Sequence, residues 1–464
     1  MRTSYAHMIA SGAILVFILF SSSALLKLLS FLFQVDGGPH VAVHLLRLSA
    51  LLVLLALTRS LYHHFGFDRG FDYVKRNAPL MHSLRRALLD AGYCIQRISL
   101  LGDCFELPKI EFYPDANNGN SILRIENSIK FQTRLDDIDV SSALKDYVLE
   151  RTYLTDDRDW YVYELIDASI KLKLRFDSHE EFEAYALSRC DAYHLFLDAR
   201  TTVPISSALV VGQTGSGKSY ALYSLILQLA AKRAVLSLCD PKNSGIAVMG
   251  HALDPGRMGT GLDSIVSQLE TFESEMNERK SKIKSLLMDD LDASYSDFGL
   301  RPYVIVIDEY AALAYALKAR DKKMRDHVAE LIASIVLQGR QLGFFIILAM
   351  QKSDASLIDT AMRENLPLII VLGNAQPQTI VTAFGTGVSV PLRDNSPGDG
   401  VFTEPHNAPS PKLCQFPDLV FLHNGTGCLG RGSCKDPRPN KNVLRAEASR
   451  SKSGSIITKE GNHD

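Results

Sequence analysis

Eight consecutive residues near the middle of the chain have the composition and spacing of a phosphate-binding loop. They are Gly212, Gln213, Thr214, Gly215, Ser216, Gly217, Lys218 and Ser219. The glycines allow the backbone to curl so that successive N–H groups point at phosphate oxygens. An apolar stretch precedes the loop and a helical pattern follows it, which is the setting of a P-loop. We therefore expect ATP to bind here, with Lys218 neutralising the β- and γ-phosphates and the Ser219 hydroxyl binding Mg²⁺.

Two adjacent acids end a strongly apolar stretch farther along the chain. The segment YVIVI at 303–307 is followed by Asp308 and Glu309, about 90 residues after the loop, as in P-loop proteins. Its β-branched residues predict a buried parallel strand whose carboxyl end presents both acids. We expect Asp308 to hold the magnesium through its water shell and Glu309 to activate the attacking water. The alternatives are that Asp308 caps the strand and that Glu309 is a structural acid.

The elements that position these residues alternate between strands and helices. Strands are expected at 208–211, 234–240, 303–307, 344–351 and 367–373, with helical patterns between them. This alternation predicts an α/β fold, a P-loop NTPase with a RecA-like, mainly parallel sheet and flanking helices. Gln351 lies just past one core strand. Its amide can sense the γ-phosphate, or it is simply a polar residue that ends a strand.

Several motifs, taken in order, resemble the FtsK/SpoIIIE family of DNA translocases. They are GQTGSGKS at 212–219, DPK at 240–242, EMNER at 275–279, YVIVIDEYAAL at 303–313, GRQLGFFIILAMQ at 339–351 and ENLP at 364–367. The resemblance covers about 206–403, less than half of the chain. Met350 and Lys352 depart from the family pattern around Gln351.

The resemblance implies a homo-hexameric ring that binds ATP between subunits and threads DNA through its centre. It also implies a role for Arg340, which matches the family's Gly-Arg pair. This side chain either reaches a neighbouring subunit's nucleotide as an arginine finger or forms a structural ion pair. An ABC transporter is disfavoured, because no LSGGQ-like signature lies upstream of Asp308.

Two apolar runs near the start of the chain predict membrane spans. They occupy 8–33 and 41 to about 57, and each approaches the roughly 20 residues that a helix needs to cross a bilayer. A cleaved signal peptide and a buried hairpin are the alternatives for these runs. Arg47 interrupts the second run and can snorkel or face a partner helix. Arginines and lysines after the second run predict that both ends lie in the cytoplasm, with the motor on that side of the cell membrane.

Four regions follow from these patterns. Two transmembrane helices are expected in 1–61, a juxtamembrane helix and a small α+β adaptor domain in 62–200, the ATPase motor in 201–430 and a polar, disordered tail in 431–464. The pattern is helical from 62 to 103. It becomes strand-like from 107 to 176, with pieces such as KIEFYPD, SILRIEN, IKFQTRL and WYVYELI. Residues 117–120, NNGN, predict a hairpin turn between the first two pieces.

The bulk composition excludes a chain that is basic throughout. Fifty lysines and arginines face 52 acids, which gives a formal net charge of -2. Contact with DNA must therefore depend on local basic patches or on a ring of subunits. Seven scattered cysteines indicate a reducing compartment rather than a disulfide framework. Cys414, His423, Cys428 and Cys434 are spaced irregularly, so unremarkable thiols are favoured over zinc.

The layout, with two expected spans and no low-complexity linker, resembles the coupling proteins of Gram-positive conjugative elements. This resemblance implies a conjugative coupling protein that delivers DNA, brought by a relaxase, to a type IV secretion channel. A reduced chromosome-partitioning translocase is one alternative. Another is a protein-export ATPase, although only one P-loop occurs here. A membrane scaffold that binds ATP without turnover is disfavoured by the presence of Lys218, Asp308 and Glu309.

The predicted spans give a direct test of topology. A reporter fused before Met1 and another fused after Arg69 should both report a cytoplasmic location, because two spans return the chain to its starting side. A glycosylation or phosphatase reporter in the 34–40 segment serves as the external control. Opposite readings from the two ends would mean that only one segment crosses or that the first is removed.

Overall fold

The structure is a computed structural model that describes residues 71–423 with short gaps, together with residues 52–56, 58–59 and 62. The gaps are 100–101, 115–118, 132–139, 145–146, 168–169, 287–292, 354–356, 359 and 392. The first predicted span and most of the second therefore lie outside the described residues, as does the predicted polar tail. Within the described part of the chain, no helix is both long enough and apolar enough to cross a bilayer. The two spans stay a prediction.

The chain divides into two compact units. The first comprises 1–172, 384–395 and 400–414, and the second comprises 173–383, 396–399 and 415–464. Each has its own hydrophobic core and its own sheet. The second unit contains every residue that the sequence assigns to nucleotide chemistry.

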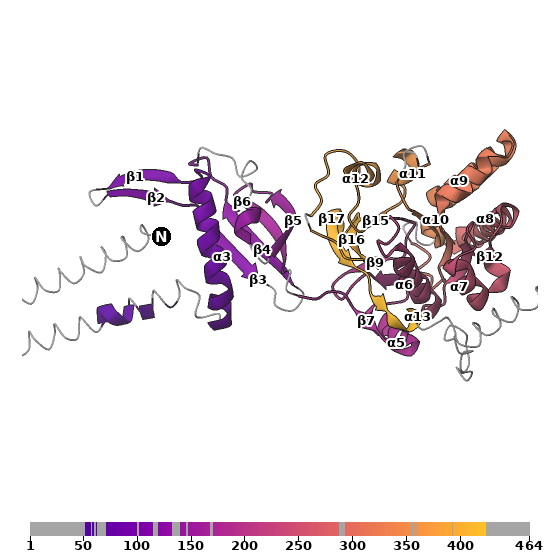
Figure 1. Cartoon of the computed structure of the whole chain (residues 1–464), viewed down its shortest axis with the longest axis horizontal. Coiled ribbons are helices and arrows are strands. Elements are labelled where there is room, and N and C mark those ends of the chain that lie inside the picture. Colours follow the sequence, from indigo (N-terminus) through magenta and orange to yellow (C-terminus); the bar gives the residue numbers. More distant parts are fainter. Residues whose placement is uncertain are drawn as a thin grey trace, which may run out of the picture. The chain divides into compact units, whose positions relative to one another are not determined.

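The first unit is a helix packed on an antiparallel sheet. Its elements are α3 (Phe71–Asp90), β1 (Ile95–Ser99), β2 (Gly102–Glu106), β3 (Ile110–Pro114), β4 (Asn120–Glu126), α4 (Ser141–Leu144), β5 (Tyr147–Leu154) and β6 (Trp160–Asp167). The sheet order is β3-β4-β6-β5, and α3 lies alongside it (Figure 1). Leu84 and Leu88 of α3 are fully buried against Leu123 and Ile125 of β4, in one cluster with the other apolar residues of these elements. Burial of this apolar face stabilises the unit.

One sequence expectation in this region is wrong, one is tested only in part and one is confirmed. The helical pattern does not continue to residue 103, because α3 ends at Asp90 and β1 and β2 then form an antiparallel hairpin. The segment 129–135 gives no strand where it is described. Phe131 of this segment instead stacks on Tyr93, with 4.6 Å between the ring centroids. The apolar side chain of Phe131 is therefore part of the hydrophobic core. The hairpin of β3 and β4 is confirmed, with Gly119 in a left-handed conformation at φ 71°.

The second unit is built on the predicted parallel sheet. Its strands are β10 (Ala208–Gly212), β11 (Val235–Cys239), β12 (Met258–Gly259), β13 (Tyr303–Ile307), β14 (Phe344–Met350) and β15 (Leu368–Leu372). They are neighbours in the order β12-β11-β13-β14-β10-β15, and each pair is parallel. All residues of β10, β14 and β15 are buried, as expected for strands covered on both faces. The predicted mainly parallel sheet is confirmed.

Helices flank this sheet. The longer ones are α5 (His179–Arg189), α6 (Lys218–Ala231), α7 (Gly245–Leu253), α8 (Leu262–Leu286), α9 (Tyr310–Lys318) and α10 (Lys322–Leu342). Shorter pieces of this unit are β7 (Arg175–Phe176), β8 (His194–Phe196), β9 (Thr202–Pro204), a 3₁₀ turn (Pro255–Arg257), α11 (Thr360–Glu364), α12 (Pro377–Phe384), β18 (Asp418–Leu419) and α13 (Val420–His423). The strands β16 (Asp399–Glu404) and β17 (Ala408–Gln415) lie mostly in 400–414, which belongs to the first unit. α10 packs on both α8 and β14.

The turn from β10 into α6 depends on glycine at two positions. Gly215 and Gly217 have φ angles of 86° and 90°, in the region that residues with a Cβ rarely adopt. Gly217 also faces the backbone of Gly398, whose N–H donates to the Ser216 carbonyl oxygen at 2.8 Å. A Cβ on Gly217 would overlap the Gly398 backbone, whereas a Cβ on Gly215 would have no neighbour within 4 Å.

This difference predicts unequal costs for two alanine substitutions. Gly215→Ala should cost about 1–2 kcal/mol of unfolding free energy, because only the left-handed backbone is penalised. Gly217→Ala should cost a further 1–3 kcal/mol, roughly, because the added methyl group overpacks against backbone atoms. Thermal unfolding of the nucleotide-free protein measures the difference. Equal melting temperatures for the two variants would contradict the close packing of 216–217 against Gly398.

Candidate functional site

Parallel pairing brings the carboxyl ends of four strands to one edge of the sheet. Val211 pairs with Met350, so the P-loop and Gln351 leave the sheet side by side. Ile307 pairs with both Leu348 and Cys239, so Asp308 leaves the sheet at the same level. The crevice outside the carboxyl ends of such strands is where α/β proteins bind ligands.

Lys218, Asp308 and Glu309 meet at this edge. The Lys218 Nζ atom lies 2.5 Å from Asp308 Oδ1 and 4.0 Å from Glu309 Oε2. The three side chains are buried, with exposed fractions of 10%, 10% and 9%. Charges with so little access to water must be paired. The two sequence motifs are therefore joined by an ion-pair cluster, in which each carboxylate faces the lysine that would bind phosphate.

A second lysine, Lys242, enters the same cluster from the loop after β11. Its Nζ atom lies 3.2 Å from Glu309 Oε2. The fully buried Asp240 holds this loop by accepting hydrogen bonds from the backbone N–H groups of Lys242, Ser244 and Ala247. The sequence motif DPK at 240–242 belongs to a family pattern that gives Lys242 no role. The signal that could have identified Lys242 as a site residue is its position directly after a core strand.

Tyr223 of α6 borders the cluster. Burial raises the pKa of Tyr223, and the nearby Asp308, Tyr220 and Asp240 raise it further. The side chain is therefore a neutral phenol at physiological pH. Burial also raises the pKa of the Cys239 thiol to about 12, with a contribution from Asp240. Cys239 is thus an inert core residue and no nucleophile.

The loop residues fit a phosphate group and a hard cation. The Ser216 hydroxyl is buried and has no hydrogen-bond partner among the described residues. Gln213, Thr214, Gly215 and Ser219 are exposed around it. Ser219 lies in the first turn of α6, where backbone N–H groups attract anions. Its hydroxyl and the Asp308 carboxylate are oxygen ligands, which Mg²⁺ prefers.

Gln351 and Arg340 lie apart from the ion-pair cluster. Gln351 follows β14 and is exposed at the same sheet edge. Arg340 is exposed in the last turn of α10. Gln351 is thus placed near the phosphate site of its own chain, whereas Arg340 is on an outer helix surface. Their roles as γ-phosphate sensor and arginine finger stay predictions.

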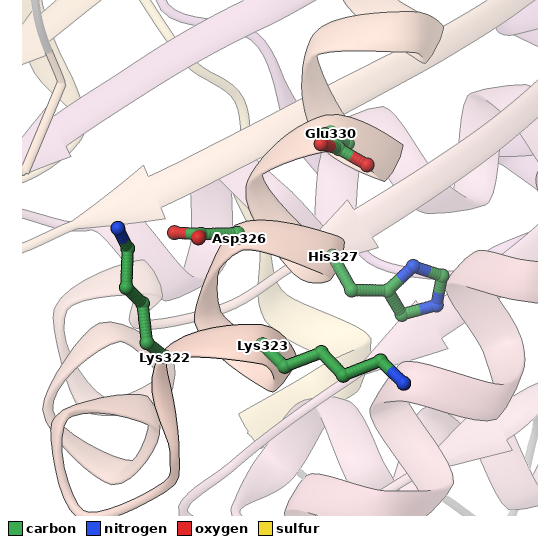
Figure 2. A pocket seen from close by; sticks show the side chains of 5 residues that line it. All are labelled: Lys322, Lys323, Asp326, His327 and Glu330. Atoms are coloured by element: carbon green, nitrogen blue, oxygen red, sulfur yellow. The ribbon is translucent and has the colours of Figure 1, made fainter.

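A set of exposed basic residues surrounds the N-terminus of α10. They are Lys318, Arg320, Lys322, Lys323 and Arg325. Arg320 pairs with Asp263 of α8 at 3.1 Å, so its charge is partly neutralised. Lys322 and Lys323 line an open hollow of about 470 Å³ with Asp326, His327 and Glu330 (Figure 2). The surface is therefore of mixed charge, and Lys318, Lys322, Lys323 and Arg325 are among its exposed cations.

Two of the four residues considered for zinc, Cys428 and Cys434, lie outside the described residues, and Cys414 is buried. Among the described residues, no group of three or more histidine, cysteine or acidic side chains is arranged to hold a metal ion.

The chain resembles known proteins in and around this site. Over 165 residues it is 29% identical to Ftsk domain-containing protein YdcQ of Bacillus subtilis (strain 168), which covers 36% of this chain and 34% of the relative. It is 30% identical over 173 residues to DNA translocase FtsK of Helicobacter pylori (strain J99), which covers 34% of this chain and 19% of the relative. The chain thus matches only about a third or less of these relatives' own lengths.

The chain is also similar to a solved structure and to a family model. The structure of the pCW3 conjugation coupling protein TcpA, monomer form, aligns with a TM-score of 0.44 and 16% identity, over 75% of this chain and 95% of that one. Residues 193–354 match the model of the FtsK/SpoIIIE family. This span includes the P-loop, Lys242, Asp308, Glu309 and Gln351. The site therefore lies in the segment that is similar to the FtsK/SpoIIIE family, and this segment is the chain's ATPase domain.

Proposed function

We propose that this protein is a membrane-anchored, ATP-driven DNA translocase. The observation that carries the proposal is the convergence of Lys218, Asp308 and Glu309 at the carboxyl edge of a parallel sheet. This arrangement unites the groups that P-loop ATPases use for phosphate, metal and water. Relatives named DNA translocase FtsK support DNA as the substrate.

The geometry supports ATP hydrolysis in which the ion pairs rearrange. In the structure, Lys218 neutralises Asp308 at 2.5 Å. The β- and γ-phosphates would attract Lys218 away, because they carry more charge than one carboxylate. Asp308 is then free to face the metal site beside Ser219, and a Mg²⁺ ion bound there would neutralise charge on the phosphates. Glu309 is left to accept a proton from the attacking water.

We further propose that the motor works as a homo-hexamer at the cell membrane, with its ATPase domain in the cytoplasm. The two predicted spans and the small α+β unit before the motor favour a conjugative coupling protein. In that role the ring would receive DNA from a relaxase and pass it to a type IV secretion channel. Chromosome partitioning and protein export are the competing roles. A measurement of DNA binding separates protein export from the two DNA-transport roles.

Substitution of the proposed base tests the hydrolytic role. Glu309→Gln should bind ATP and assemble but hydrolyse about 100- to 10,000-fold more slowly, because the amide keeps the shape and cannot accept the proton. Lys218→Ala should abolish turnover, since it removes the cation that faces the phosphates. Steady-state ATPase assays with an analogue-binding control measure both. A Glu309→Gln rate within about tenfold of wild type would assign the base to another group.

Replacement of Lys322, Lys323 and Arg325 by Ala tests the DNA role. Binding should weaken across unrelated sequences, and the slope of log affinity against log salt should flatten by roughly one unit for each phosphate that the variant no longer binds. The rate of DNA-stimulated ATP hydrolysis should also fall, whereas the rate without DNA should stay at the wild-type level. Fluorescence anisotropy at several salt concentrations gives the slope.

The matched control replaces Lys280 and Lys282, two exposed lysines of α8. This variant should keep the wild-type salt slope. If the α10 variant also keeps it, the DNA path lies elsewhere on the motor. A wild-type ring that binds no DNA even at low salt would instead favour protein export.

A further inference from the structure

We propose that Lys242 is a positioning residue for Glu309, holding one carboxylate oxygen so that the other faces the attacking water. The inference rests on the proposed ATPase function and names a residue that the P-loop and the Asp308–Glu309 pair do not include. Lys242 lies 66 residues before Asp308, and only the pairing of β11 with β13 brings the two segments together.

Both cationic contacts of Glu309 are made at the same oxygen. Lys242 Nζ lies 3.2 Å from Glu309 Oε2, and Lys218 Nζ lies 4.0 Å from the same atom. In the described part of the chain, these are the ion pairs of this carboxylate. A carboxylate has two oxygens with about four acceptor sites, so a cation fixed on Oε2 leaves Oε1 for water.

Nucleotide binding makes Lys242 the more important of the two lysines. Lys218 is the P-loop lysine, and phosphate groups would attract it away from Asp308 and Glu309. Glu309 would then have a side chain of 9% exposure whose remaining cation is Lys242. Because an unpaired charge at such a site is strongly disfavoured, loss of Lys242 would let the Glu309 side chain turn away.

The backbones on both sides are held in place. Glu309 has φ 53° and ψ 60°, a left-handed conformation, where α9 begins. Its neighbour Asp308 donates its N–H to the Cys239 carbonyl oxygen at 2.9 Å. On the Lys242 side, Asp240 accepts a hydrogen bond from the Lys242 N–H at 3.0 Å. The Lys242 side chain is about half exposed, and its Nζ atom contacts Glu309. Asp240 therefore fixes the backbone of Lys242, and Glu309 fixes the end of its side chain.

The test compares Lys242→Met and Lys242→Arg with a matched control in the full-length protein. Lys242→Met should lower kcat by about tenfold, equal to about 1.4 kcal/mol of transition-state stabilisation. Affinity for a non-hydrolysable ATP analogue should stay within about twofold, because the phosphates are bound by Lys218 and backbone N–H groups. Lys242→Arg should recover most of kcat, since it keeps the cation. Lys282→Met, which removes the exposed ion pair to Glu278 on α8, should leave kcat unchanged.

A double-substitution cycle gives the decisive readout. If Lys242 acts through Glu309, Lys242→Met should cause no further loss of single-turnover rate in the Glu309→Gln background. Equal losses in both backgrounds would overturn the proposal and make Lys242 independent of the base. An unchanged or raised kcat in Lys242→Met would overturn it too, as would a loss of analogue affinity as large as the loss of kcat. These outcomes leave the proposed function intact, whereas a wild-type protein without ATPase activity would contradict that function itself.

Discussion

The buried ion-pair cluster of Lys218, Asp308 and Glu309 constrains the whole second unit. Each of these side chains is no more than one-tenth exposed, and removal of one partner would leave a buried charge without compensation. The fold must therefore bring the start of α6 and the end of β13 within ion-pair distance. The parallel sheet meets this requirement by ending its strands at a common edge.

The sheet order determines which residues share the site. β14 lies between β10 and β13, so the exit of Gln351 falls between the P-loop and Asp308. β11 lies on the other side of β13, and this places the 240–242 loop opposite Glu309. The P-loop is packed from its other side by Gly398, which leaves room only for glycine at 217. The geometry of the site therefore depends on the order of the strands.

The charged groups of the second unit fall into a buried set and an exposed set. The ion-pair cluster is buried, and the half-exposed Lys242 borders it at Glu309. The exposed cations Lys322, Lys323 and Arg325 lie at the start of α10 and are followed by Asp326 and Glu330. A near-neutral chain can therefore offer a local basic surface, which phosphate contacts in a ring of several copies would reinforce.

The P-loop, the acidic strand end and the strand and helix alternation could be predicted because each is encoded in contiguous residues. Glycine conformation, strand hydrophobicity and the order of motifs depend on short windows, and β10, β13 and β14 occur where these patterns predict them. The β1–β2 hairpin was missed because residues 100–101 are both leucine and carry no turn signal. The apolar Phe131 contributed to the expected strand at 129–135, but its ring packs in the core beside Tyr93. Tertiary structure alone decided that Lys242 meets Glu309 and that Gly398 packs on Gly217. These contacts join segments from 67 to 181 residues apart, and strand pairing and packing between elements, rather than any local pattern, bring such segments together.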